Sequence, residues 1–298
     1  MSVDRSRAPS LPDDGVQLRV LGPLEVRRAA EPTAALPGRL RRVLAALLVA
    51  PGAVVPVDRL VDVVWGQDIP DDPAAALHNL IARLRHRLSG DGSAQPPVSL
   101  ITRSPGYVLD VGRDVLDATS FEDLATDATS VLTERPDVAT GLFERALALW
   151  RGPAYAEFAD EDFARPEAAR LEELRLSTVE NLAESLLLAG RHELAAAQLQ
   201  AVVASGSLRE RPHLQLMLAH YRAGRQADAL GVARDYRDRL ADELGLDPSP
   251  AVQRLQDEIL RQDERLAAVA SDDNRPGLER LGYLPLLRFT IWHRPRAL

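Results

Sequence analysis

The sequence predicts a mainly α protein, with an N-terminal winged helix-turn-helix domain (α+β) followed by an all-α tetratricopeptide-like helical repeat domain. Two observations lead to this fold class. Short apolar strands surround three amphipathic helices before residue 112, and from Asp114 onward helical periodicity continues almost without interruption, with a 34-residue repeat. We expect a disordered arm at 1–15, the winged helix at 16–112, the helical domain at 113–270 and a C-terminal tail at 271–298.

Composition excludes several kinds of chemistry. The 298 residues include no Cys, and all 36 basic residues are Arg, which excludes disulfides, thiolate metal sites, a P-loop lysine and a Schiff base. Residues 1–112 carry 13 Arg against 12 acidic residues, whereas 113–298 carry 23 against 32. A nearly neutral segment joined to an acidic one fits a DNA-binding module fused to a protein-contacting module. Without a long apolar run or a signal-peptide core, we expect a cytoplasmic protein with no membrane partner.

The first elements are a broken strand and a helix with a basic first turn. Residues 16–26 alternate as a strand that Gly22-Pro23 interrupts, and 39–50 form an amphipathic helix. Arg39, Arg41 and Arg42 crowd the start of that helix. Cations there oppose the helix dipole, so helix stability does not explain them. A bound DNA phosphate does, and we therefore expect phosphate contacts from these three arginines.

A second and a third helix follow. Asp58 is the expected N-cap of a helix over 59–65, which Gly66 ends. The third helix spans 71–88, with Asp71 or Asp72 as cap and Pro73 in its first turn. One stripe packs inward: Leu77, Leu80, Ile81, Leu84 and Leu88. The remaining faces offer polar side chains, with Asn79, Ala82, Arg83 and His86 opposite the stripe and His78, Arg85 and Arg87 on its flanks.

A hairpin completes the winged-helix order and favours DNA binding over the alternative of an ordinary solvated helix. Strands at 98–101 and 107–111 flank a tip at 102–106, which carries Arg103. In a winged helix the third helix enters the major groove and the hairpin tip reaches a flanking groove or phosphate. Trp65 and Tyr107 are expected in the core. The expected DNA-binding residues are Arg39, Arg41, Arg42, His78, Asn79, Arg83, Arg85, His86, Arg87 and Arg103.

The second half contains an internal repeat. Residues 166–188 predict a long helix, and the Ala-Gly-Arg that follows it at 189–191 recurs at 223–225, 34 positions later. Leu182 matches Leu216 and Ala195 matches Ala229 at the same offset. This is the period of tetratricopeptide helix–turn–helix units, with a generic helical bundle as the alternative. A last helix is expected at 251–268, capped by Asp247 or Ser249.

The sequence contains no catalytic constellation. His192-Glu193 begins like a zincin motif, but Ala196 stands where the second His belongs. Neither a Gly-rich nucleotide loop before a helix nor a Gly-x-Ser-x-Gly motif occurs. We therefore expect no enzyme activity, no cofactor and no metal.

Several segments, in this order and spacing, resemble the Streptomyces antibiotic regulatory protein family over about residues 16 to 268. They lie at 21–26, 60–66, 82–85, 102–107, 147–153, 170–176, 208–211 and 242–247. The resemblance implies an OmpR-type winged helix followed by a bacterial transcriptional activation domain. It also implies that Arg41, Asn79, Arg83 and Arg103 touch DNA.

In function, the resemblance implies an activator of secondary-metabolite (antibiotic) gene clusters. Such proteins bind direct repeats in promoter DNA and recruit RNA polymerase holoenzyme, including its sigma factor. Direct repeats require a head-to-tail contact between copies, so we expect a side-by-side homodimer on DNA. The alternatives are a protein-interaction scaffold of tetratricopeptide type and a repressor of the same architecture.

Overall fold

The computed structural model describes residues 16–28, 36–88 and 97–267. The expected arm at 1–15 and tail at 271–298 lie outside these ranges. Contacts divide the chain into two compact units, one comprising Met1–Asp127 with Leu142–Ser177 and the other Ala128–Gly141 with Thr178–Leu298. The mainly helical fold with small N-terminal sheets confirms the predicted fold class.

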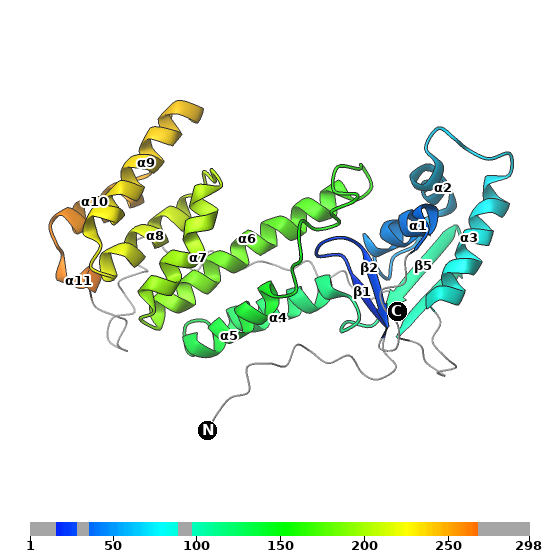
Figure 1. The fold of residues 1–298 in the computed structure, drawn as a ribbon, viewed down its shortest axis with the longest axis horizontal. Coiled ribbons are helices and arrows are strands. Elements are labelled where there is room, and N and C mark those ends of the chain that lie inside the picture. Colours follow the sequence, from blue (N-terminus) through cyan, green and yellow to red (C-terminus); the bar gives the residue numbers. More distant parts are fainter. Residues whose placement is uncertain (1–15, 29–35, 89–96, 268–298) are drawn as a thin grey trace, which may run out of the picture. The chain divides into compact units, whose positions relative to one another are not determined.

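The first unit contains the winged helix (Figure 1). Its elements, as far as the end of the wing, which is the hairpin of β4 and β5, are β1 (Val16–Arg19), β2 (Glu25–Arg28), α1 (Gly38–Leu48), β3 (Val55–Pro56), α2 (Val57–Trp65), α3 (Pro73–Leu88), β4 (Val98–Arg103) and β5 (Gly106–Val111). Strands β1 and β2 form an antiparallel pair, and the other three form an antiparallel sheet in the order β3-β5-β4. Three helices then lead into the second half of the chain: α4 (Asp117–Val131), α5 (Pro136–Leu147) and α6 (Arg165–Leu188).

Local sequence signals fix some of these helix ends. The carboxylate of Asp72 accepts a hydrogen bond from the Ala75 amide at 2.9 Å, so Asp72 caps α3. Gly66 ends α2 with a φ of 57°, as expected. The expectation for Asp58 was wrong, because α2 begins earlier at Val57 and places Asp58 inside the first turn. Pro56 takes the N-cap position there, without a side-chain cap.

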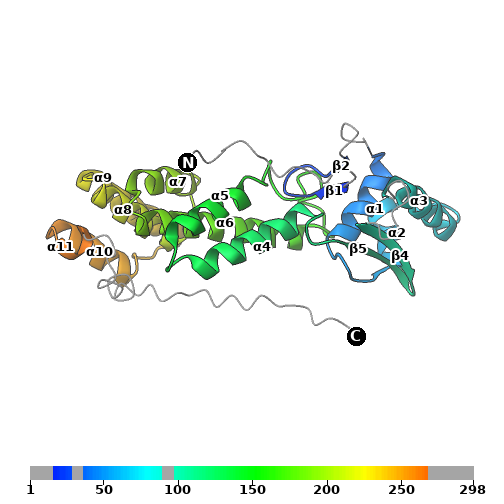
Figure 2. The ribbon, with the colours of Figure 1, turned by 90° about the horizontal axis from the view of Figure 1, so that it is seen from below.

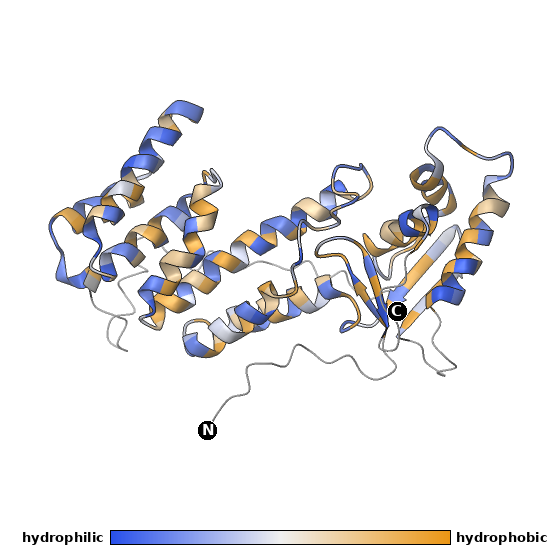
Figure 3. Ribbon diagram, viewed as in Figure 1, coloured by the Kyte–Doolittle hydropathy of each residue, from blue (hydrophilic) through white to orange (hydrophobic). Residues whose placement is uncertain are grey.

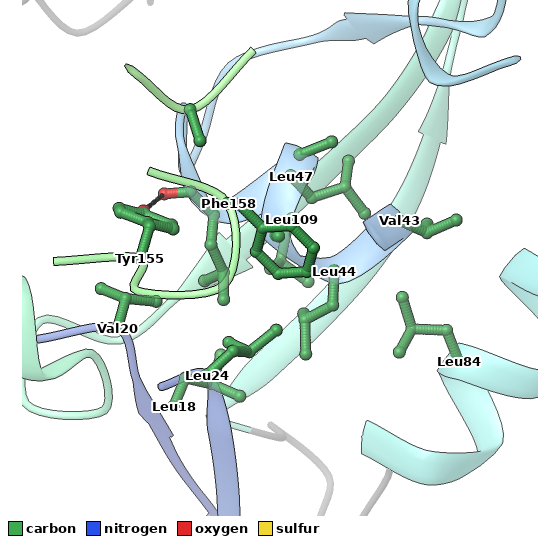
Figure 4. Close-up of a cluster of buried hydrophobic side chains, with 14 of the residues drawn as sticks. Leu18, Val20, Leu24, Val43, Leu44, Leu47, Leu84, Leu109, Tyr155 and Phe158 are labelled. Carbon is green, nitrogen blue, oxygen red and sulfur yellow. Dashed lines mark hydrogen bonds between the residues drawn. The ribbon is translucent and has the colours of Figure 1, made fainter. Parts of the chain in front are cut away.

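The core of the first unit draws on both halves of the sequence (Figure 4). Leucines and valines of β1, the segment between β1 and β2, α1, α3 and β5 lie in one buried cluster with Tyr155 and Phe158, which come from the segment after α5. Trp65 and Tyr107 are buried, as predicted. The compact unit therefore continues past residue 112, because residues after α5 fill its core.

The start of α4 is tied to the end of β1. The buried carboxylate of Asp117 accepts hydrogen bonds from the backbone amides of Val20 at 2.7 Å and Leu21 at 3.1 Å. Next to it, the amide of Leu18 donates to the carbonyl of Val115 at 2.9 Å. Burial raises the pKa of Asp117, while the two amide hydrogen bonds oppose that shift. This carboxylate thus accepts hydrogen bonds from the two backbone amides that directly follow β1.

The second unit shows the 34-residue repeat in three dimensions. Its later helices are α7 (His192–Ala204), α8 (Glu210–Arg222), α9 (Gln226–Leu244), α10 (Pro250–Leu260) and α11 (Glu264–Ala267). Gly190 and Gly224, 34 positions apart, adopt φ values of 73° and 75° at equivalent turns. Each is followed by an Arg whose amide donates back to the preceding helix at 2.8 Å. The buried pairs Leu182 with Leu216 and Ala195 with Ala229 confirm the repeat.

The last predicted helix is interrupted. Ser249 caps α10 through its hydroxyl, which accepts from the Ala251 amide at 3.1 Å. The expectation of one continuous helix over 251–268 was wrong, because Gln262 adopts a φ of 54° and the Asp263 amide donates back to Glu258 at 3.0 Å. This closes α10 in the manner of a helix C-cap, and Asp263 then precedes α11.

Candidate nucleic-acid interface

Helix α3 has one buried and one exposed face. Leu77, Ile81 and Leu84 are at most 1% exposed, whereas Asn79, Ala82, Arg83 and His86 are exposed on the other side. Hydrophilic residues gather towards the C-terminal half of the helix (Figure 3). The predicted stripe is therefore confirmed, and the helix presents an amide, a guanidinium and an imidazole to solvent.

The exposed polar side chains of α3 are available for a ligand. Within the described residues, no hydrogen bond or ion pair engages the side chains of Asn79, Arg83 or His86, and the same holds for the flanking His78 and Arg87. The carbonyl of Arg87 accepts a hydrogen bond from the Arg28 guanidinium, which satisfies a free carbonyl at the end of the helix. Asn and Arg side chains of this kind are those that pair with adenine and guanine edges in the major groove.

Arg85 lies differently from its neighbours. It is half-buried, and its Nε donates to the Leu100 carbonyl at 2.8 Å while its Nη2 donates to the Thr102 hydroxyl at 2.7 Å. Both acceptors belong to β4, which lies beside α3 (Figure 2). Arg85 thus joins α3 to the wing, a role that its charge alone did not reveal.

Two arginines of α1 have carboxylate partners within the first unit. Arg41 pairs with Glu157 and donates to the Leu24 carbonyl at 2.6 Å. Arg42 pairs with Glu161 and donates to the Val63 carbonyl at 2.8 Å.

The carboxylates of Glu157 and Glu161 explain why two cations lie near the start of α1, and no DNA phosphate is needed to explain them. The sequence did not reveal them, because the two pairs join residues 116 and 119 positions apart. Arg39 stays exposed, with its guanidinium 5.9 Å from the Trp65 ring centre.

The wing carries one exposed cation on a closely packed hairpin. Strand β4 extends to Arg103, so this residue precedes the tip at Ser104-Pro105. A Cβ on Gly106 would lie 1.9 Å from the Val55 carbonyl oxygen, and only glycine allows β5 to approach β3 so closely. The Val57 amide also donates to the Pro105 carbonyl at 3.2 Å, which anchors the tip to α2.

Neither a metal site nor a membrane-spanning helix is found in the described part of the chain. Its ranges contain no group of three or more His, Asp or Glu side chains that could hold a metal ion. In the same ranges, no helix has both the length and the apolar character that crossing a membrane requires.

Comparisons with known proteins agree with this architecture. The family described as "Transcriptional regulatory protein, C terminal" matches residues 31–109, and "Bacterial transcriptional activator domain" matches 116–260. The regulatory protein DnrI of Streptomyces peucetius is 32% identical over 272 residues, which cover 90% of this chain and 96% of DnrI. The transcriptional regulator RedD of Streptomyces coelicolor is 36% identical, covering 86% of this chain and 74% of RedD.

Two further relatives are longer than the matched region. The regulatory protein AfsR of Streptomyces griseus is 37% identical over 91% of this chain, which spans only 27% of AfsR. The solved structure of Mycobacterium tuberculosis EmbR in complex with a low affinity phosphopeptide matches with a TM-score of 0.78 and 30% identity. The match covers 90% of this chain and 69% of that one.

A winged helix followed by tetratricopeptide-like helices defines a class of transcriptional regulators, and the relatives carry regulator names rather than enzyme names. The chain belongs to the Streptomyces antibiotic regulatory protein family.

Proposed function

We propose that this protein is a sequence-specific DNA-binding activator that binds direct repeats in promoter DNA and recruits RNA polymerase holoenzyme. The observation that supports it best is the exposed face of α3, where Asn79 and Arg83 stand free of protein partners in the described structure. Residues of these types discriminate bases in the major groove. The contacts proposed for α3 come from His78, Asn79, Arg83, His86 and Arg87, with Arg103 reaching from the wing.

The arginines with protein partners take a different place in this proposal. Arg41 and Arg42 stabilise the first unit through Glu157 and Glu161, and Arg85 joins α3 to β4. Arg39 is the α1 cation that remains exposed for a phosphate. Phosphate contacts set orientation and salt dependence, whereas base contacts set specificity.

In this proposal the helical repeat domain recruits RNA polymerase holoenzyme. Residues 113–298 have an excess of nine acidic residues over Arg, a charge that opposes DNA binding and attracts basic protein surfaces. The relatives in this family are named as transcriptional regulators, which supports a role in transcription. The partner in this proposal is RNA polymerase holoenzyme, including its sigma factor, and the target is a secondary-metabolite gene cluster. Direct repeats require a head-to-tail contact between two copies, which gives a side-by-side homodimer on DNA.

The test is binding followed by transcription with the full chain. We expect duplexes selected from a randomised pool to contain two repeats in the same orientation, and a promoter carrying them to gain transcripts with purified polymerase holoenzyme. A control promoter with scrambled repeats should not respond. Failure to select any sequence would favour the protein-interaction scaffold. Specific binding with a fall in transcript level would identify a repressor.

A further inference from the structure

The edge strand of the wing sheet needs hydrogen-bond partners on its open side. In the order β3-β5-β4, strand β4 pairs only with β5 inside the sheet. Outward carbonyls of an edge strand require another donor. The Leu100 carbonyl receives that donor from Arg85 of α3 at 2.8 Å.

The guanidinium of Arg85 holds two points of this strand at once. Its second hydrogen bond, of 2.7 Å, goes to the hydroxyl of Thr102, which is the residue before Arg103 in β4. Two parallel donors in a rigid fork fix both distance and orientation, which a single ammonium cannot do. Arg85 itself is half-buried, whereas Arg83 and Arg103 on either side of the link are exposed.

We propose that Arg85 is a positioning residue, which sets the wing against α3 so that Arg103 and Arg83 reach the same DNA face. Its contribution to binding then passes through Arg103 and does not come from neutralising a phosphate. This inference rests on the proposed DNA-binding function. It names a residue that supports DNA binding indirectly, although its charge suggested a direct contact.

The proposal is tested by a double-mutant cycle in the full chain, using the duplex that wild-type protein selects from a randomised pool. Arg85→Lys keeps the charge and loses the fork, and Arg103→Ala removes the wing cation. We expect each to weaken binding about five- to tenfold, the order of one lost DNA contact. The double variant should then be at most about twofold weaker than the weaker single variant, because both changes remove the same contact.

Two further variants keep the proposal testable if Arg85→Lys fails to fold. Thr102→Val removes one acceptor but keeps a β-branched residue in the strand, and we expect it to weaken binding and to be sub-additive with Arg103→Ala. Arg145→Lys, an exposed Arg on α5, is the matched control and should leave affinity unchanged. In hydroxyl-radical footprinting, the Arg85→Lys and Thr102→Val variants should lose protection of the DNA on the wing side alone. Their unfolding midpoints should equal that of the wild-type protein.

Full additivity in both cycles, or no effect of Thr102→Val, would overturn the positioning role. A footprint loss centred on the α3 groove would overturn it as well. If wild-type protein selects no sequence at all, the proposed DNA-binding function fails instead, so the two failures are distinguishable.

Discussion

The hydroxyl of Tyr155 donates a hydrogen bond to the backbone carbonyl of Leu48 at 2.9 Å, across 107 positions of sequence (Figure 4). Leu48 is the last residue of α1, where carbonyls lack an intrahelical partner. Tyr155 is 1% exposed, and burial raises its pKa well above the ordinary value. A segment of the second half thus completes the core of the winged helix.

Replacing Tyr155 should destabilise the first unit. Tyr155→Phe leaves the Leu48 carbonyl buried without its partner, which costs about 1–3 kcal/mol. Tyr155→Ala adds a cavity and should cost about 3–5 kcal/mol. Denaturant unfolding followed by Trp fluorescence checks both, since Trp65 lies in this unit. Equal stabilities of wild type and the Phe variant would show that the hydrogen bond contributes nothing.

Arg103→Ala should weaken binding to all DNA sequences alike. Arg103 is exposed at the wing and offers a phosphate contact. Its loss should lower the slope of log affinity against log salt by roughly one unit. Titrations at several salt concentrations with selected and scrambled duplexes measure this slope. A loss confined to the selected duplex would mean that Arg103 reads a base.

Arg41→Ala should leave that salt slope unchanged. Because Arg41 pairs with Glu157, we expect a change in the free energy of unfolding of at most about 1 kcal/mol, typical of a partly exposed ion pair. Glu157→Gln is the matched variant, and the two changes should not add in the double variant. If Arg41→Ala lowers the salt slope, the guanidinium leaves Glu157 for a phosphate when DNA binds.

The second unit should lose stability in mild acid. Burial lowers the pKa of His213 and of His220 on α8 below the ordinary value of 6.5. The unfolded chain therefore binds more protons near this pH, so stability is complete above pH 6.5 and falls as the pH drops below it. His213 also donates from Nδ1 to the Arg209 carbonyl at 2.8 Å and stacks on Tyr236.

Chemical unfolding between pH 5 and pH 7.5 measures this dependence. His220→Gln should flatten the pH slope even if it changes stability at neutral pH. The same slope in wild type and in the Gln variant would mean that His220 protonates equally in the folded and unfolded chain.

Periodic features were predictable from the sequence because they depend on near neighbours. The Leu stripe of α3 follows from helical spacing, and the 34-residue repeat places Gly190 and Gly224 in the same backbone conformation. Asp72 and Ser249 cap the helices they precede, since a side-chain cap is a local signal.

Distant pairings could not be predicted, because nothing in the local sequence specifies them. The carboxylates of Glu157 and Glu161 account for the basic turn of α1 only once the chain has folded. Arg85 and Arg83 are two positions apart with the same charge, yet only Arg85 lies over the edge of β4. The positive charges identified the candidate DNA-binding residues, whereas only the folded structure shows which of them have partners within the protein.

The central claim, that the exposed face of α3 reads DNA bases, is tested most directly by Arg83→Ala. The side chain lies opposite the buried stripe, so the fold should be unaffected. Binding to every single-base variant of the selected site should show lost discrimination at one base pair, by about 1–3 kcal/mol, with wild-type preferences elsewhere. A folded Arg83→Ala protein with the full wild-type base preferences would contradict the placement of α3 in the major groove.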